Sequence, residues 1–290
     1  MNKIYYGVEV AFSKENYDTI YNLLYAEGIK TILEENGIIK FSIEDKNSSE
    51  LIKSKLLSLP SITEKDIFIS KLENQDWNME WEKSIEPVYI KDKIIVYPSW
   101  KKNELKNPNG KILIEIDPKM SFGTGHNETT QMMLEMMYDY IDNNDKYLLD
   151  YGCGTAVLAI AGIKLGVKLA VAIDIDKDSI LNAMECVRKN EVSNIVKLYK
   201  ANINEISEKD FDIIVCNIDR TVILGNLKTI HAKLKPGGKL FITGILREEE
   251  NEVKDSFKKQ KFELIETRNK AEWLAFYTTK QPVIPAKAEI

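Results

Sequence analysis

The stretch "LLDYGCGTAV", residues 148–157, joins an apolar run to a Gly-Cys-Gly turn and then to further apolar residues. A glycine turn at the carboxyl end of a buried strand lets the backbone approach a ligand closely before a helix begins. The next apolar run, "KLAVAIDID" (168–176), places Asp174 twenty-two positions after Gly152. An acidic residue at the tip of a second strand can bond both ribose hydroxyls of a nucleoside. Together the two features predict a nucleoside-binding unit.

Apolar runs alternate with helical patterns around this unit. Such alternation predicts an α/β domain with a mostly parallel, doubly wound sheet and helices on both faces. The last two runs, "KFELIETRNK" and "AEWLAFYTT", predict a terminal hairpin. The expected strands lie at 146–152, 168–176, 195–201, 211–218 and 237–246, with helices such as 179–190 and 221–234 between them.

The first seventy residues follow a different order, β-α-β-β-α-β, which is typical of a ferredoxin-like α+β domain. Ser13 is a plausible N-cap of the first helix and Gly28 its stop. The dipeptide Asn36-Gly37 predicts a hairpin between the two central strands. This module carries no catalytic cluster, so it is interpreted as a binding or scaffold domain.

A length of 290 residues favours two domains. Residues 73–86 hold five acidic residues and one lysine, a net charge of −4, and Trp77 and Trp81 lie one helical turn apart. This stripe is expected to pack on a neighbouring domain; the alternative is a partner-binding surface. The predicted divisions are a ferredoxin-like domain at 1–72, an acidic helical connector with a lead-in strand at 73–102, an α/β domain with the nucleoside-binding unit at 103–280 and a tail at 281–290.

Composition excludes several classes of protein. The formal net charge of −5 argues against direct nucleic-acid binding. The chain has no run of about 18 apolar residues, so no membrane span is expected. Three cysteines without a CxxC pair favour a reduced, cytoplasmic setting. Two histidines, His126 and His231, are too few for a histidine-rich metal site, so no metal is expected. We expect a monomer.

The glycine turn discriminates between nucleoside cofactors. A dinucleotide site needs the pattern GxGxxG, in which the third glycine lets a helix start fit the pyrophosphate. Here Thr155, Ala156 and Val157 follow Gly154, so the third glycine is missing. S-adenosylmethionine has no phosphate and does not need it. The turn therefore favours S-adenosylmethionine over a nicotinamide cofactor.

The run "FDIIVCNIDR" (211–220) places Asn217 at the tip of the fourth strand. In a doubly wound sheet, the carboxyl ends of strands one, two and four surround one crevice. The side-chain carbonyl of Asn217 could orient an attacking amine and accept its hydrogens. The alternative is a turn-forming asparagine at a strand end.

Several of these stretches resemble the bacterial methyltransferase of large-subunit ribosomal protein eleven. The most specific is "SFGTGHNETT" (121–130), since the "DYGCG" turn is common to most class I S-adenosylmethionine methyltransferases. The resemblance covers nearly the whole chain. Its further segments are "LLDYGCGTAVLAIAGIKLG", "AIDID", "VCNI", "LKPGGKLFITGIL", "DWNMEWEKSIEPVYI" and "IIVYPSW".

The resemblance implies a cytoplasmic protein N-methyltransferase that uses S-adenosylmethionine and acts on lysine and N-terminal amines of that ribosomal protein. The N-terminal domain would dock this substrate. Carried over by position, the cofactor contacts are Thr130, Gly152, Asp174 and Asn217, with Asn217 also catalytic. Many members read GTGTHPTT, GCGSG and NIL where this chain has GTGHNETT, GCGTA and Asn217-Ile218-Asp219. The roles of His126 and Asp219, both candidates for a general base, are therefore left open.

The turn at Gly123-Thr124-Gly125 precedes a helix expected to begin near Asn127. Free N–H groups at a helix start attract anions, so this turn is expected to grip the methionine end of the cofactor. Phe122 could cover the cofactor or belong to the core. The methionines of this helix are expected to pack in the core; they are Met132, Met133, Met136 and Met137.

Three other functions stay open from sequence alone. One is a class I methyltransferase for a small molecule, which the docking domain argues against. Another is a nicotinamide-dependent oxidoreductase, which the missing third glycine opposes. The last is a non-catalytic binding module that retains the fold.

Overall fold

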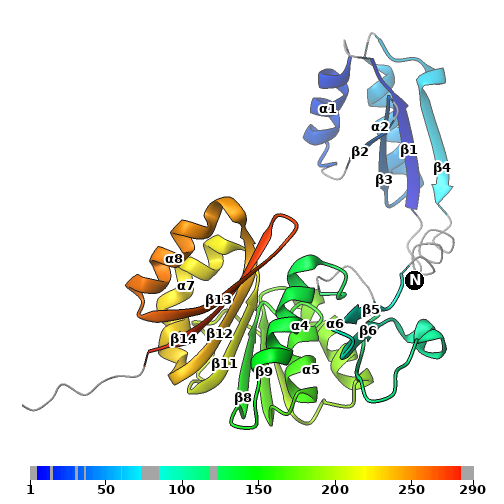
Figure 1. The fold of residues 1–290 in the computed structure, drawn as a ribbon. Coiled ribbons are helices and arrows are strands. Elements are labelled where there is room, and N and C mark those ends of the chain that lie inside the picture. Colours follow the sequence, from blue (N-terminus) through cyan, green and yellow to red (C-terminus); the bar gives the residue numbers. More distant parts are fainter. Residues whose placement is uncertain are drawn as a thin grey trace, which may run out of the picture. The chain divides into compact units, whose positions relative to one another are not determined.

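The computed structural model describes residues 5–13, 16–29, 32–35, 37–59, 61–72, 85–117 and 123–281. The chain divides into two compact units, Met1–Ser84 and Ile85–Ile290 (Figure 1). Trp77, Trp81, Phe122 and the predicted tail after Gln281 lie outside the described residues. Within the described ranges, no helix is long and apolar enough to cross a membrane.

The first unit has the predicted ferredoxin-like order. Its four strands form an antiparallel sheet in the order β2-β3-β1-β4, and both helices pack on one core with Val8, Val10 and Phe41. The elements are β1 (Tyr5–Ala11), α1 (Tyr17–Ala26), β2 (Leu33–Glu35), β3 (Ile38–Ile43), α2 (Lys46–Leu57), the 3-10 turn Glu64–Asp66 and β4 (Ile67–Leu72).

Helix α1 begins later than its sequence predicts. Its N-cap is Asn16, not Ser13. The Ser13 N–H donates to Asn16 Oδ1 at 2.7 Å, so the asparagine side chain closes a turn that precedes the helix. The helix stops as expected at Gly28, whose φ of +81° suits a residue without a side chain.

The second unit is built on a seven-stranded sheet in the order β10-β9-β8-β11-β12-β14-β13. Six strands run in the same direction, and β14 runs opposite to its neighbours β12 and β13. The strands β13 and β14 form the predicted terminal hairpin. The strands are β8 (Tyr147–Tyr151), β9 (Leu169–Asp174), β10 (Val196–Lys200), β11 (Phe211–Asn217), β12 (Leu234–Leu246), β13 (Phe262–Lys270) and β14 (Trp273–Lys280).

Helices cover both faces of this sheet, as predicted for a class I methyltransferase fold (Figure 1). One face carries α4 (Glu128–Tyr140), α5 (Val157–Lys164) and α6 (Lys177–Lys189); the other carries α7 (Arg220–Lys233) and α8 (Glu250–Lys259). A separate three-stranded sheet precedes them, with β5 (Val88–Ile90), β6 (Ile94–Tyr97) and β7 (Ile112–Glu115). Short 3-10 turns span Ser99–Glu104 and Arg247–Glu249.

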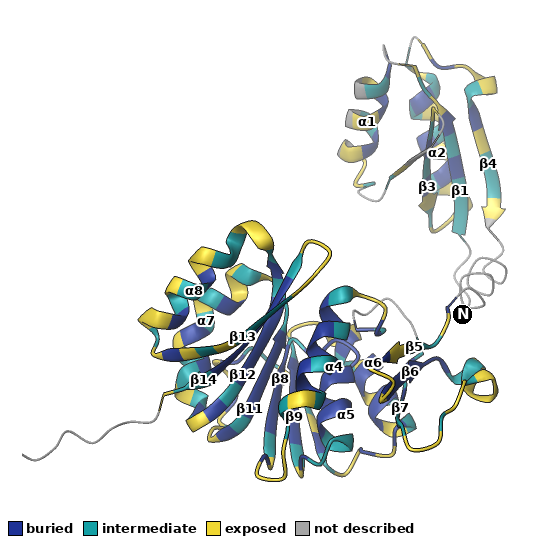
Figure 2. Cartoon of the chain, in the orientation of Figure 1, coloured by how far each residue is buried: buried dark blue, intermediate teal, exposed yellow. Residues whose placement is uncertain are grey.

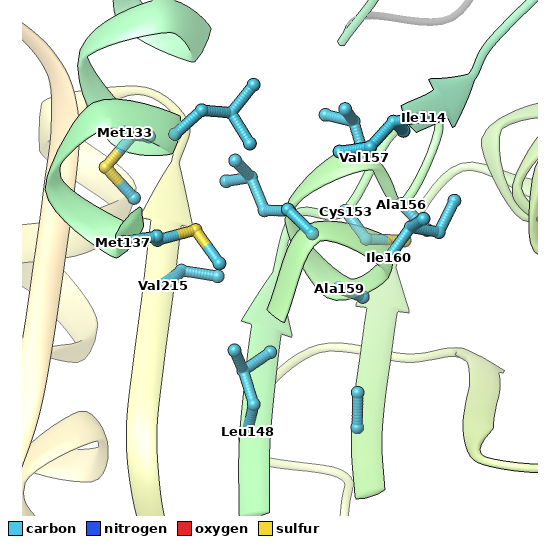
Figure 3. Close-up of a cluster of buried hydrophobic side chains, with 14 of the residues drawn as sticks. Ile114, Met133, Met137, Leu148, Cys153, Ala156, Val157, Ala159, Ile160 and Val215 are labelled. Carbon is cyan, nitrogen blue, oxygen red and sulfur yellow. The ribbon is translucent and has the colours of Figure 1, made fainter. Parts of the chain in front are cut away.

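The sheet is buried on both faces because successive side chains point to opposite sides of a strand. Leu148 packs in the cluster under α4, α5 and α6, whereas its neighbour Leu149 packs under α7 and α8. In Figure 2 the central strands of this sheet are mostly dark blue, and exposed residues lie on the outer sides of the helices and in the loops. The predicted packing role of the four methionines of α4 is confirmed: each is at most 2% exposed, and Met133 and Met137 share a cluster with Val215 of β11 (Figure 3).

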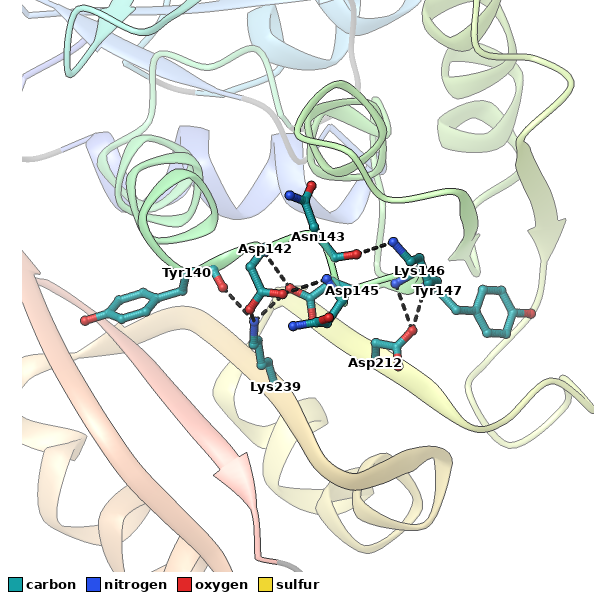
Figure 4. Close-up of polar contacts among 9 residues, drawn as sticks. Tyr140, Asp142, Asn143, Asp145, Lys146, Tyr147, Asp212 and Lys239 are labelled. Atoms are coloured by element: carbon teal, nitrogen blue, oxygen red, sulfur yellow. Dashed lines mark hydrogen bonds and ion pairs between the residues drawn. The ribbon is translucent and has the colours of Figure 1, made fainter.

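A polar network fastens the carboxyl end of α4 to the sheet (Figure 4). The Lys239 ammonium of β12 donates to the Tyr140 carbonyl at 2.7 Å and binds the carboxylates of Asp142 and Asp145. Asp212 of β11 accepts hydrogen bonds from the backbone N–H groups of Lys146 and Tyr147, both at 2.9 Å. These contacts fix α4 relative to β11 and β12 at the end opposite the strand tips.

Candidate functional site

A pocket of about 520 Å³ lies at the carboxyl ends of the central strands. The tips of β8, β9 and β11 meet there, because β8 lies between the other two in the sheet. Gly152, Asp174 and Asn217 line the pocket, whereas Thr130 lies behind its wall. Its other lining residues are Asn127, Glu128, Thr129, Gly154, Ser179, Ile218, Asp219, Arg220, Thr221, Gly244, Leu246, Glu249 and Trp273.

The Asp174 carboxylate is held by two backbone N–H groups, one of them in the turn at Gly152-Cys153-Gly154. Gly154 N–H donates to its Oδ2 and Asp176 N–H to its Oδ1, each at 3.0 Å. A carboxylate has about four acceptor sites, so both oxygens can still accept hydrogen bonds from a ligand. The arrangement holds a fixed negative charge at the pocket wall.

Two glycines make room for Ile218, the residue after Asn217. A Cβ on Gly152 would lie 2.1 Å from Ile218 Cγ2, and a Cβ on Gly244 would lie 2.3 Å from the Ile218 carbonyl oxygen. Both glycines have positive φ, +76° and +84°. The segment that carries Asn217 is therefore seated against two backbones that tolerate no side chain.

The two glycine turns are joined to each other. The buried Thr155 hydroxyl, in the second turn, donates to the Gly123 carbonyl, in the first, at 2.7 Å. Gly123 has a φ of +101°, and a Cβ there would lie 2.7 Å from Thr155 Oγ1. The contact fixes the loop before α4 against the loop before α5.

The start of α4 presents unsatisfied donors to the pocket. Helix α4 begins at Glu128 after the N-cap Asn127, as expected, but the Asn127 side chain makes no capping hydrogen bond. Thr129 lines the pocket and is 4% exposed, and its Oγ1 has no hydrogen-bond partner among the described residues. A buried hydroxyl without a partner is rare, and beside a helix start it suits an anionic group such as a carboxylate.

Thr130, the next residue, contacts Asn217 rather than the pocket. Asn217 Nδ2 donates to Thr130 Oγ1 at 3.1 Å, and Thr130 is fully buried. The sequence drew attention to the threonine pair, but only the rotation of α4 decides which member faces the pocket.

The two residues left open as bases occupy different places. His126 is outside the pocket lining: its Nε2 donates to the Glu86 carbonyl at 2.9 Å, and its Nδ1 lies 3.3 Å from Thr124 Oγ1. Asp219 lines the pocket and caps α7 by accepting from Thr221 N–H at 2.8 Å. Hydrogen bonds from Thr221 hold the pKa of Asp219 below its usual range, so this carboxylate is a weak base.

A second carboxyl, Asp150, lies beneath the glycine turn and is 1% exposed. Burial raises its pKa to about 7; the N–H of Ala159, at 3.0 Å, opposes this shift, and the nearby charge of Asp174 adds to it. Desolvation disfavours an ionised carboxylate, so a neutral carboxyl exists here below neutral pH.

The far wall of the pocket comes from β12 and β14 and was not predicted. Trp273 and Leu246 supply apolar surface, and they are paired across the two strands. Glu249 binds the Arg220 guanidinium at 2.8 Å. Leu246 ends the quoted segment "LKPGGKLFITGIL", but no motif marks Trp273, which reaches the site only because β14 is inserted between β12 and β13.

Comparisons with known proteins agree with this geometry. A family model described as "Ribosomal protein L11 methyltransferase (PrmA)" matches residues 5–281. The ribosomal protein L11 methyltransferase of Alkaliphilus oremlandii is 34% identical over 230 residues, covering 78% of this chain and 72% of that protein. The one from Listeria innocua serovar 6a is 32% identical over 279 residues, covering 93% and 87%.

A solved structure supports the fold. The ribosomal protein L11 methylase from Lactobacillus delbrueckii subsp. bulgaricus matches with a TM-score of 0.63 at 22% identity, covering 68% of this chain and all of that chain. The predicted resemblance is thereby confirmed, and the chain belongs to the ribosomal protein L11 methyltransferase family.

Proposed function

We propose that this chain is an S-adenosylmethionine-dependent N-methyltransferase that methylates lysine and N-terminal amines of ribosomal protein L11. The observation that carries the proposal is the convergence of Asp174, Asn217 and the start of α4 at Thr129 on one pocket at the strand tips. When bound, the cofactor supplies a methyl group on a positively charged sulfur. Family membership supports the choice of substrate.

The chemistry of the pocket fits this cofactor. Asp174 offers acceptors for two ribose hydroxyls, and the turn at Gly152 lets the nucleoside lie against the backbone. The start of α4, including the backbone N–H of Thr129, offers donors to the methionine carboxylate. This assignment gives Thr129 the direct contact that the sequence resemblance gave to Thr130.

The pocket also suits an amine nucleophile. A lysine amine has an ordinary pKa of about 10.4 and must lose its proton to attack. Ile218, Leu246 and Trp273 line the pocket with apolar surface, which disfavours the charged ammonium. Asn217 Oδ1 can accept hydrogen bonds from the neutral amine and hold it in line with the methyl group.

The N-terminal unit is proposed to dock the protein substrate. Residues 1–72 contain nine lysines and eleven acidic residues, a net charge of −2, and residues 73–86 add −4. A mildly acidic surface steers a basic partner toward the site, and tethering raises the local concentration of its amines. We also propose a cytoplasmic setting, which the buried cysteines Cys153, Cys186 and Cys216, none of them in a disulfide, support.

The decisive experiment incubates the full chain with radiolabelled cofactor and purified ribosomal protein L11. Label should enter L11 with the wild type, and Asn217→Ala should lower this transfer more than it lowers cofactor affinity, which calorimetry measures. A fragment spanning 85–290 should bind the cofactor yet lose transfer to L11. No labelling of L11 by the full chain would refute the substrate, and full transfer by the fragment would refute the docking role.

A further inference from the structure

We propose that Asp219 selects a positively charged methyl acceptor by binding its ammonium group at the open end of the pocket. The inference rests on the proposed function and deepens it, because it assigns a residue that determines substrate specificity. The described lining residues include four acids and one arginine, so four negative charges and one positive charge give a net −3. The acids are Glu128, Asp174, Asp219 and Glu249. Their positions and partners identify Asp219 as the carboxylate that can receive a cationic acceptor.

The part of the pocket beyond Asn217, here called the acceptor end, is separate from the surfaces proposed for the cofactor. Those surfaces are the tips of β8 and β9 and the start of α4, which carry Asp174 and Glu128. The acceptor end is formed by the start of α7 and by the ends of β12 and β14. Its lining residues include Ile218, Asp219, Arg220, Leu246, Glu249 and Trp273. Asp219 and Glu249 are the two carboxylates in this set.

The charge of Glu249 is already matched by groups of the protein. Its Oε1 lies 2.8 Å from Arg220 Nε, and its Oε2 accepts a hydrogen bond from the Leu246 N–H at 2.9 Å. The Arg220 guanidinium also pairs, through Nη1, with Glu252 of α8. Both ion pairs of Arg220 are therefore made with carboxylates that follow β12, and neither is made with the adjacent Asp219.

Asp219 keeps a negative charge that no cation pairs with in the described part of the chain. Its Oδ1 accepts a hydrogen bond from the Thr221 N–H at 2.8 Å as the N-cap of α7. The start of a helix stabilises a negative charge, so the carboxylate stays ionised although Trp273 lines the same pocket. Asp219 is exposed, whereas Asn217 is half-buried. The free charge therefore lies at the outer part of the acceptor end.

An unpaired carboxylate at this place favours a cation over a neutral group of the same shape. A lysine side chain arrives as an ammonium because its ordinary pKa is about 10.4. Asp219 binds this ammonium at the exposed end, and the apolar wall further in disfavours the charge, so the proton passes to solvent water before the nitrogen reaches Asn217. An alcohol or an amide carries no charge and gains nothing from Asp219. The residue thus selects amines without contacting the atoms that react.

The first test uses small probes in place of L11. In the full chain labelled with ¹⁵N-tryptophan, the indole N–H signal of Trp273 reports binding at the acceptor end, and Trp273→Phe identifies that signal. Titrations with n-butylammonium chloride and with 1-butanol, in the presence of S-adenosylhomocysteine, give the two dissociation constants. At low salt the wild type should bind the ammonium ~3-fold to 10-fold more tightly than the alcohol. This preference should vanish in Asp219→Asn, and in the wild type it should shrink at about 0.5 M salt.

Three variants separate Asp219 from the charge of the pocket as a whole. Asp219→Asn keeps an oxygen that can accept the Thr221 hydrogen bond and cap α7. Asp255→Asn removes the same charge from α8, where the side chain is 64% exposed and outside the pocket lining. Glu128→Gln removes a pocket charge at the start of α4. Both controls should keep most of the preference for the ammonium. An unchanged preference in Asp219→Asn, or an equal loss in either control, would overturn the proposal.

Steady-state assays with L11 give a second, kinetic readout. Asp219→Asn should raise the KM for L11 by ~3-fold to 10-fold, with kcat and the affinity for S-adenosylmethionine changed by less than ~2-fold. A fall in kcat at unchanged KM would contradict the proposal, because Asp219 would then act on the reacting atoms. If the wild type fails to methylate L11, the proposed function fails, while the probe titrations still decide whether Asp219 selects a cation.

Discussion

Replacing Asp150 by asparagine tests the electrostatics beneath the glycine turn. Asp150 is 1% exposed, and burial raises its pKa from 3.8 to about 7. Between these values the folded chain keeps the proton that the unfolded chain has lost, so the folded state binds more protons and stability falls as pH rises. Each pKa unit is worth 1.36 kcal/mol, so ionising Asp150 costs the fold about 4 kcal/mol in full.

The side chain of Asp150→Asn cannot ionise, yet its oxygen can still accept the Ala159 N–H hydrogen bond that Asp150 makes at 3.0 Å. Urea unfolding gives the free energy of unfolding of both proteins at about pH 5 and about pH 8. Between these pH values the free energy of unfolding of the variant should rise by about 3 kcal/mol relative to that of the wild type. Asp142→Asn is the control. Lys239 holds the pKa of Asp142 below its usual range, so that variant should differ from the wild type by a constant amount over the same interval. Parallel stability profiles for the wild type and Asp150→Asn would refute the reasoning.

Two further substitutions test the pocket itself. Asp174→Ala should weaken S-adenosylmethionine binding by about 1.5–3 kcal/mol for each lost ribose hydrogen bond; calorimetry measures this, and unchanged affinity in a folded variant contradicts the assignment. Gly244→Ala places a Cβ 2.3 Å from the Ile218 carbonyl oxygen at a φ of +84°, so it should lower both stability and kcat. Gly237→Ala in the same strand, with a φ of +76° and open space around the Cβ, should cost only the backbone strain of about 1–2 kcal/mol; equal effects of the two variants would rule out the clash.

The sequence predicts the fold and one side of the pocket because both depend on local patterns. Alternating apolar and helical runs define the order of the strands, and strand tips one, two and four of a doubly wound sheet must then meet. The order of the strands alone therefore predicts that Gly152, Asp174 and Asn217 lie at one crevice, and no tertiary contact needs to be known. Family resemblance adds the loop before α4, which the Thr155 hydrogen bond joins to the glycine turn.

The remaining features depend on contacts that no local pattern encodes. The threonine pair leaves the choice between Thr129 and Thr130 open, since the roll of α4 follows from how its methionines pack on β11. Trp273 and Leu246 reach the pocket through pairing between β12 and β14. Ser13 was predicted to cap α1 because serine suits that position, but the helix begins after Asn16, whose side chain makes no capping hydrogen bond and instead accepts one from the Ser13 N–H.

The position of β14 between β12 and β13 has a consequence for synthesis. A ribosome makes the chain from its amino end, and β14 emerges after every other strand of this sheet, yet it completes the interior of the sheet. Until residues 273–280 are available, β12 and β13 have no strand between them, and the pocket lacks the wall formed by Trp273. A nascent chain that already contains Asp174 and Asn217 therefore still has an incomplete site, and the pocket becomes complete only after β14 has been translated.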